Sequence, residues 1–221
     1  MIHPDNPLLE TTVTQIEQIA PHVFIIRIPK LFSFVPGQVI AAGLTANDPE
    51  PRLYSIASGL QEKYISILFQ RIDDGLLTPH LSELNPGDTI YVSKPFGTFY
   101  GKAGKAWWIA TGTGIAPFYS MFKSGLSNDK KLIHGGKYRH SFYFEKEFSA
   151  TLKDNYIRCC SREDVSGAKR GRVTRYLLSL SEIPTNIKYY LCGSAEMIVE
   201  VRDLLLDRGV PFTNIHAEIY F

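Results

Sequence analysis

Short runs of β-branched and aromatic residues fill the first hundred positions of the chain. They include Val23–Ile28, Tyr64–Phe69 and Thr89–Val92, and turn signals such as Pro36-Gly37 and Asn85–Asp88 separate them. Apolar runs of strand length at this spacing are typical of antiparallel sheets. The pattern therefore predicts an antiparallel β-barrel or sandwich at the start of the chain.

The pattern changes near Gly101–Gly104, a short Gly/Lys stretch of linker composition. Beyond it, strand-like runs alternate with segments of helical period, which indicates a parallel sheet covered by helices. The clearest helix covers 195–208 and stops at Gly209. We expect a β-barrel domain over residues 1–101 and a doubly wound α/β domain over 102–221. The expected parallel strands are Trp107–Ala110, Lys131–His134, Tyr156–Cys160, Tyr189–Cys192 and Ile215–Ile219.

Composition narrows the class of protein. The formal net charge of the 221 residues is +2, which excludes nucleic-acid binding through overall charge. The three cysteines form no disulfide framework and have no metal or iron–sulfur spacing, so we expect a reducing, cytoplasmic location. No apolar run approaches the length of a membrane span, and we expect no membrane contact. Four histidines also lack metal-ligand spacing and receive no ligand role: His80, His134, His140 and His216.

Two segments have residue types suited to cofactor binding. In Thr111–Pro117 an apolar strand runs into a glycine turn, and Pro117 falls where the first helical residue belongs. Such a turn can bind a phosphate, although a tight turn without a ligand has the same sequence. In Arg52–Ser55, alternation places Arg52 and Tyr54 on one strand face. A cation and an aromatic ring there suit a phosphate and a flat ring, or simply a solvated cross-strand pair.

Taken together and in order, six segments resemble motifs of the ferredoxin–NADP⁺ reductase family of flavoenzymes, particularly its compact bacterial type. The resemblance covers essentially the whole chain. The segments are Arg52-Leu53-Tyr54-Ser55, Gly75-Leu76-Leu77-Thr78, Lys94-Pro95-Phe96-Gly97-Thr98-Phe99, Gly112-Thr113-Gly114-Ile115-Ala116-Pro117, Cys192-Gly193-Ser194-Ala195-Glu196-Met197 and Ala217-Glu218-Ile219-Tyr220-Phe221.

The resemblance implies a flavin site built mainly by the first domain. In it Arg52 holds the FAD pyrophosphate, Tyr54 packs on the isoalloxazine and Ser55 hydrogen-bonds near the reactive nitrogen. The C-terminal tail completes this site, and a terminal aromatic, Phe221, stacks on the adenine, which favours FAD over FMN. Anchoring of the terminal strand is the alternative role for Phe221. The remaining flavin-binding residues expected from the resemblance are Leu53, Leu68, Phe69, Gly75, Leu77, Thr78 and Tyr220.

The resemblance also implies a pyridine-nucleotide site in the second domain. Ser55, Cys192 and Glu218 surround the ring contact as catalytic residues, with Glu218 orienting the nicotinamide or moving a proton. Without the resemblance, Cys192 is more simply a buried small residue and Glu218 an exposed terminal carboxylate. The other residues expected to bind this nucleotide are Thr111, Gly112, Thr113, Gly114, Pro117, Gly193 and Met197.

Arginines after the third expected parallel strand favour NADP(H). Arg162 and Arg172 suit bidentate contact with its extra phosphate, and Ser161 and Lys137 join them in the expected site. Glu163 offers the opposite interpretation, because a carboxylate here could bind the ribose hydroxyls of NAD and repel that phosphate. The neighbouring segment Lys169-Arg170 is more simply a solvated basic loop.

The function implied is electron transfer between NADPH and a ferredoxin or flavodoxin through bound FAD, by a monomer. Since the chain lacks cysteines for an iron–sulfur cluster, the one-electron partner is expected to be a separate protein. Two alternatives stay open. The chain could be an NAD(P)H reductase for an oxygenase or for free flavin, or a binding module that keeps the fold without the chemistry.

Overall fold

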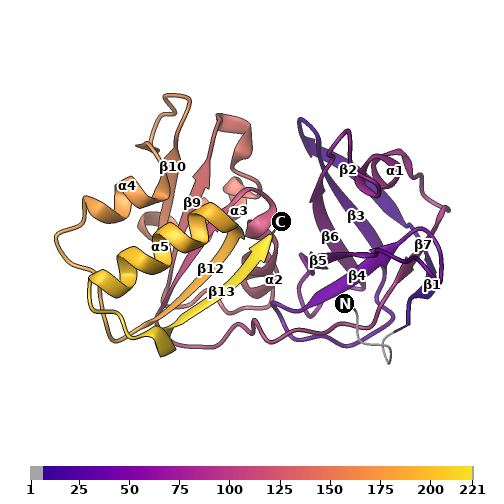
Figure 1. The fold of residues 1–221 in the computed structure, drawn as a ribbon, viewed down its shortest axis with the longest axis horizontal. Helices are drawn as coiled ribbons and strands as arrows, with labels where there is room; N and C mark the ends of the chain where they lie inside the picture. Colours follow the sequence, from indigo (N-terminus) through magenta and orange to yellow (C-terminus); the bar gives the residue numbers. More distant parts are fainter. Residues whose placement is uncertain (1–6, 221) are drawn as a thin grey trace. The chain divides into compact units, whose positions relative to one another are not determined.

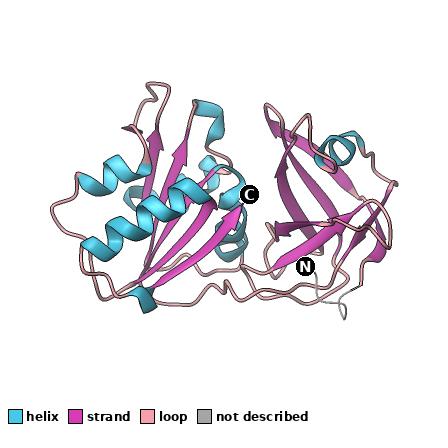
Figure 2. Cartoon of the chain, in the orientation of Figure 1, coloured by secondary structure: helices cyan, strands magenta, loops and turns pink. Residues whose placement is uncertain are grey.

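The computed structural model describes residues 7–220 and divides the chain into two compact units. The first unit runs to Gly101 and also contains Ala116–Ser124; the second contains Lys102–Ile115 and the chain from Gly125 onward. Each unit has its own hydrophobic core. Strands dominate the first unit, and helices accompany the sheet of the second (Figure 2).

Two antiparallel sheets form the first unit, in the orders β1-β7-β4-β5 and β2-β3-β6. The chain passes from β1 into β2 after only two residues, and Ile56, directly after β5, bridges Ile67 on β6. The sheets thus connect at both edges, as the predicted barrel requires. The elements are β1 (Leu9–Thr12), β2 (Gln15–Ala20), β3 (Val23–Pro29), β4 (Val39–Gly43), β5 (Arg52–Ser55), β6 (Tyr64–Gln70), α1 (Thr78–Glu83) and β7 (Thr89–Val92).

The turn Lys94–Phe99 is hydrogen-bonded to the first residue of β4. The backbone groups of Val39 and Phe96 exchange two hydrogen bonds of 2.9 Å. Gly37 has φ +104°, and a Cβ there would lie 1.9 Å from the carbonyl oxygen of Phe99. Only glycine fits this close approach of two backbones, so the turn and the strand specify each other.

Helix α2 (Ala116–Lys123) belongs to the first unit by its contacts. The Ser120 hydroxyl donates to the carbonyl of Ser58 at 2.7 Å, and the rings of Phe118 and Phe99 meet edge to face at 5.9 Å. The boundary expected from the pattern near Gly101 assigns α2 to the second domain. The chain instead returns to the first unit, a long-range contact that local patterning does not encode.

The second unit contains one parallel sheet in the order β11-β10-β9-β8-β12-β13. Helices α4 and α5 cover one face, while α3 contacts β9 and β10 (Figure 1). The predicted doubly wound sheet is therefore confirmed. The elements are β8 (Ala106–Thr111), the 3₁₀ turn η1 (Gly112–Ile115), β9 (Lys130–Gly136), η2 (Arg139–Ser141), α3 (Glu145–Leu152), η3 (Lys153–Asn155), β10 (Tyr156–Cys160), β11 (Lys169–Arg170), α4 (Val173–Leu178), β12 (Lys188–Ser194), α5 (Ala195–Asp207), η4 (Phe212–Asn214) and β13 (Ile215–Tyr220).

Two local predictions in this unit have different outcomes. The helix expected over 195–208 is α5, which Ser194 caps through its hydroxyl and which ends before Gly209. The expected loop Lys169-Arg170 is wrong, because its backbone forms β11 beside Cys159-Cys160. Both β11 side chains are exposed, so the pattern reads as a loop. Between residues 7 and 220, no helix combines the length and apolar character that crossing a membrane demands.

Candidate functional site

Most residues expected to bind the nicotinamide half of the nucleotide meet at the carboxyl ends of β8 and β12. The chain leaves β8 for β9 on one side and later returns to β12 on the other, and ligands of doubly wound sheets bind at such a point. Glu218 on β13 lies opposite Cys192 in the strand register. We call this group the switch-point site; it comprises Thr111, Gly112, Gly114, Cys192, Gly193 and Glu218.

Close packing around the backbone explains two of its glycines. A Cβ on Gly114 would lie 2.4 Å from the carbonyl oxygen of Cys192. A Cβ on Gly193, which has φ +148°, would lie 2.3 Å from the Thr111 hydroxyl oxygen. Gly112 differs, because φ is +57° and open space surrounds its Cβ position. Gly114 and Gly193 therefore join the two strand ends, and Gly112 turns the chain.

The hydroxyl of Thr111 is the clearest sign of a ligand. Its oxygen is buried, and no other group in the described part of the chain hydrogen-bonds to it. A buried hydroxyl without a partner costs free energy. A polar group of a bound nucleotide beside Gly193 would satisfy it, so the site fits such a ligand. Thr113 lies in the 3₁₀ turn η1, which follows β8. Because η1 ends at Ile115 and α2 begins at Ala116, Pro117 is the second residue of α2 rather than its first.

Cys192 and Met197 are buried, whereas Glu218 is only partly buried. The backbone N–H of Met197 donates to the Ser194 hydroxyl at 3.4 Å, which fixes the start of α5. Cys192 is buried near the carboxyl end of β12. Glu218 lies within β13 rather than on an exposed terminus.

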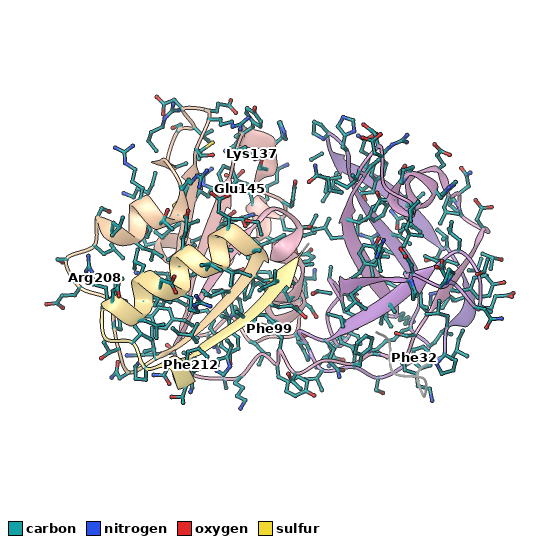
Figure 3. The ribbon with its side chains drawn as sticks, in the orientation of Figure 1. Phe32, Phe99, Lys137, Glu145, Arg208 and Phe212 are labelled. Carbon is teal, nitrogen blue, oxygen red and sulfur yellow. The ribbon has the colours of Figure 1, made fainter. Side chains whose placement is uncertain are left out.

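The residues expected to read the second phosphate lie together at the ends of β9, β10 and β11. The Ser161 N–H donates to the Gly136 carbonyl and the Arg162 N–H to the Lys137 carbonyl, both at 3.0 Å. The Gly171 N–H donates to the Cys160 carbonyl at 2.7 Å and brings the next residue to the same edge. Figure 3 labels Lys137 there. We call this group the basic edge; it comprises Lys137, Ser161, Arg162 and Arg172.

Glu163, which follows Arg162 of the basic edge, uses its carboxylate to accept a hydrogen bond from the backbone. Its Oε2 accepts a hydrogen bond of 2.7 Å from the backbone N–H of Arg139. This bond joins the turn after β10 to η2, which follows Lys137. The Arg162 guanidinium lies 3.4 Å from the Tyr138 hydroxyl in the same region. The sequence alone allows Glu163 to bind the ribose of NAD. In the structure its carboxylate already accepts a hydrogen bond from the Arg139 backbone.

Arg172 contacts two carboxylates that the sequence analysis did not single out. Its Nη1 lies 2.7 Å from Glu196 and 3.6 Å from Glu200, both on α5. The hydrogen bond that Arg172 donates to Glu196, together with the negative charges of Glu196 and Glu200, raises the pKa of Arg172. No sequence signal predicts these pairs, because 24 positions separate Arg172 from Glu196.

A buried histidine lies on β9, the strand that leads to the basic edge. His134 on β9 is fully buried, with Nδ1 3.0 Å from the Tyr156 hydroxyl and its ring perpendicular to Phe142. Burial, helped by the Arg158 charge, lowers the pKa of His134 to about 3, so the imidazole stays neutral. No group of three or more metal-ligating side chains occurs within the described range.

In the first unit, β5 positions the proposed flavin residues. Arg52 is exposed and pairs with Glu50 at 3.1 Å, and Leu53 is 53% exposed. Tyr54 is 8% exposed and meets Phe69 edge to face at 6.2 Å, within the barrel core. This burial raises the pKa of the Tyr54 hydroxyl well above its usual range. Tyr54 therefore packs as a core residue, which sequence alternation alone did not establish.

The other proposed flavin residues lie on β6 and in the turn before α1. Leu68 and Phe69 are buried. Gly75 donates its N–H to the Ile72 carbonyl, and the Thr78 hydroxyl accepts from the Ile72 N–H, each at 2.9 Å. Exposed Arg52 and half-buried Thr78 keep polar groups suited to a pyrophosphate. Ser55 and Leu77 are buried, and the Tyr220 side chain and all of Phe221 lie outside the described residues.

Comparison with known proteins identifies the family to which the chain belongs. The chain is 34% identical to a flavodoxin/ferredoxin–NADP reductase of Rhodobacter capsulatus over 233 positions, which cover 90% of this chain and 86% of the relative. The chain belongs to the ferredoxin–NADP⁺ reductase family. The resemblance to this family is thus confirmed. Residues 10–100 match the oxidoreductase FAD-binding domain and residues 108–203 the oxidoreductase NAD-binding domain, so the protein is a flavoprotein oxidoreductase.

Other members of the ferredoxin–NADP⁺ reductase family have a similar fold and varied names. A Neisseria gonorrhoeae ferredoxin NADP⁺ reductase, solved with FAD and NADP, has a TM-score of 0.86 and 21% identity over 97% of this chain and 99% of its own. A toluate 1,2-dioxygenase electron transfer component of Pseudomonas putida is 27% identical over 84% of this chain, which spans 58% of that protein. Membership therefore gives the fold and class but not the electron acceptor.

Proposed function

We propose that the protein transfers electrons between NADPH and a separate ferredoxin or flavodoxin, acting as a monomer with FAD. The observation that carries the choice of NADPH is the basic edge, which lies on the same sheet as the switch-point site. Neighbouring strands are about 4.8 Å apart, so β10 lies about 14 Å from β12, the strand that carries Cys192. That distance suits a nucleotide whose nicotinamide lies in the switch-point site and whose adenosine phosphate lies at the basic edge.

In this proposal each stretch of the sheet binds one part of NADPH. The N–H groups of Gly112–Ile115 and the Thr111 hydroxyl bind the pyrophosphate region. Cys192 and Met197 pack beside the nicotinamide, and Glu218 orients it or holds a proton. Arg162, Arg172 and Lys137 bind the second phosphate, while Ser161 adds a hydroxyl.

Glu163 supports NADPH over NADH. A carboxylate that accepted ribose hydroxyls would also repel a phosphate on that ribose. The Glu163 carboxylate instead accepts the Arg139 N–H and ties together the two turns that carry Lys137 and Arg162.

In the first unit, Arg52 and Thr78 are proposed to bind the FAD pyrophosphate, and Ser55 to hydrogen-bond the flavin ring. Tyr54 and Phe69 line the ring site from the barrel core, with Leu53, Leu68, Gly75 and Leu77 shaping it. When bound, FAD accepts a hydride from the dihydronicotinamide and releases the two electrons singly.

Ferredoxin or flavodoxin is the proposed acceptor because the Rhodobacter capsulatus relative carries both in its name. Reduction of an oxygenase or of free flavin is the second candidate, favoured by the dioxygenase component among the relatives. The test is NADPH-driven cytochrome c reduction with added ferredoxin, flavodoxin or FMN. We expect saturable stimulation by at least one of the two proteins. Stimulation by FMN alone would contradict the proposed acceptor.

A further inference from the structure

Arg172 belongs to the basic edge, and its side chain forms ion pairs with α5. It directly precedes α4, and its guanidinium reaches carboxylates one helical turn apart on α5, 2.7 Å to Glu196 and 3.6 Å to Glu200. All three side chains are well exposed, at 62%, 65% and 41%. Exposed ion pairs contribute little to folding stability, so these contacts can exchange with a ligand.

We propose that Glu196 and Glu200 are specificity-determining counter-charges that hold Arg172 and set the affinity for the nucleotide's second phosphate. This inference rests on the proposed function, in which Arg172 contacts that phosphate. To reach the phosphate, the guanidinium must leave Glu196 or share itself between two anions. The carboxylates therefore lower the affinity for NADPH and leave NADH, which lacks the phosphate, unaffected.

The position of Glu196 explains why it remains a competitor after Arg172 moves. It lies in the first turn of α5, where the helix dipole favours a negative charge. Glu196 keeps its charge there without the arginine. A phosphate offers the guanidinium a stronger bidentate contact than a single carboxylate oxygen, so binding still proceeds.

The test is calorimetric binding of 2′-phospho-AMP and of AMP to the FAD-loaded protein. Glu196→Gln should tighten the Kd for 2′-phospho-AMP about two- to fivefold and leave that for AMP unchanged. Asp207→Asn is the matched control, because it removes one charge from the other end of α5, about 16 Å away. Unchanged or weaker 2′-phospho-AMP binding by Glu196→Gln would overturn the inference.

Glu196→Gln in an Arg172→Ala background shows whether Glu196 changes the Kd for 2′-phospho-AMP through Arg172. Glu196→Gln should then give no gain, because the arginine that it releases is missing. An equal gain would overturn the inference, since Glu196 would then act on the phosphate directly. If Arg172→Ala alone leaves the preference for 2′-phospho-AMP over AMP unchanged, the proposed role of Arg172 in the NADP site fails. If it abolishes that preference while Glu196→Gln has no effect, only the counter-charge inference fails.

Discussion

The switch-point site and the basic edge lie along one edge of the same parallel sheet but are built differently. In the switch-point site, the backbone of Cys192 and the hydroxyl of Thr111 lie so close to Gly114 and Gly193 that these glycines accept no side chain. In the basic edge, exposed side chains carry the chemistry and the backbone only joins the turns. In the proposed function, the rigid part binds what all pyridine nucleotides share, and the exposed part distinguishes NADPH from NADH.

The largest expected effect comes from breaking the rigid part. Gly114→Ala places a Cβ 2.4 Å from a carbonyl oxygen and should lower the free energy of unfolding by about 3 kcal/mol. Urea denaturation measures this. The control Gly125→Ala has φ +81° and open space, so it should cost only about 1 kcal/mol. Equal losses would mean that the contact with Cys192 is not the constraint.

Removal of charge from the basic edge should change specificity rather than stability. Arg162→Ala with Arg172→Ala should raise the KM for NADPH about 30- to 1,000-fold, because each of the two charged contacts contributes about 1–2 kcal/mol. The KM for NADH should stay within about twofold. Steady-state kinetics with both nucleotides measures this, and a parallel rise in both KM values would rule out the two arginines as phosphate readers.

Sequence predicted the rigid part better than the exposed part, and the reason is physical. Glycine turns, strand runs and the stop of α5 at Gly209 are local signals, so the parallel sheet and the turn after Thr111 were predicted. The partners of Arg172 and the return of α2 to the first unit depend on long-range contacts. The burial of Tyr54 depends on the barrel core, which strand alternation does not specify.

The buried histidine beneath the basic edge predicts a pH effect. His134 has a folded pKa of about 3 and an ordinary value of 6.5, so only the unfolded chain binds a proton between these values. Stability should therefore be full above pH 6.5 and fall as the pH drops toward 3, by about 1.4 kcal/mol per pH unit near pH 5. His134→Gln should flatten this slope in urea titrations at pH 7, 6 and 5. An unchanged slope would assign the acid sensitivity to other groups.

The smallest effect is expected from the bond between Glu163 and the Arg139 backbone. Glu163→Ala should cost about 1 kcal/mol of stability and raise the KM for NADPH about threefold, because the turn that carries Lys137 loosens. Glu163→Gln keeps an acceptor and should have a weaker effect. A lower KM for NADPH in Glu163→Ala would show that the carboxylate repels the phosphate instead.

The most direct test of the account is anaerobic stopped-flow reduction of the bound flavin by NADPH and, separately, by NADH. We predict that NADPH reduces the flavin at least about tenfold more efficiently at low concentration, because in the proposed function only NADPH carries the phosphate that binds the basic edge. The Arg162→Ala, Arg172→Ala protein should lose this preference and keep its rate with NADH. Equal or faster reduction by NADH in the unaltered protein would contradict the central claim that the basic edge selects NADPH.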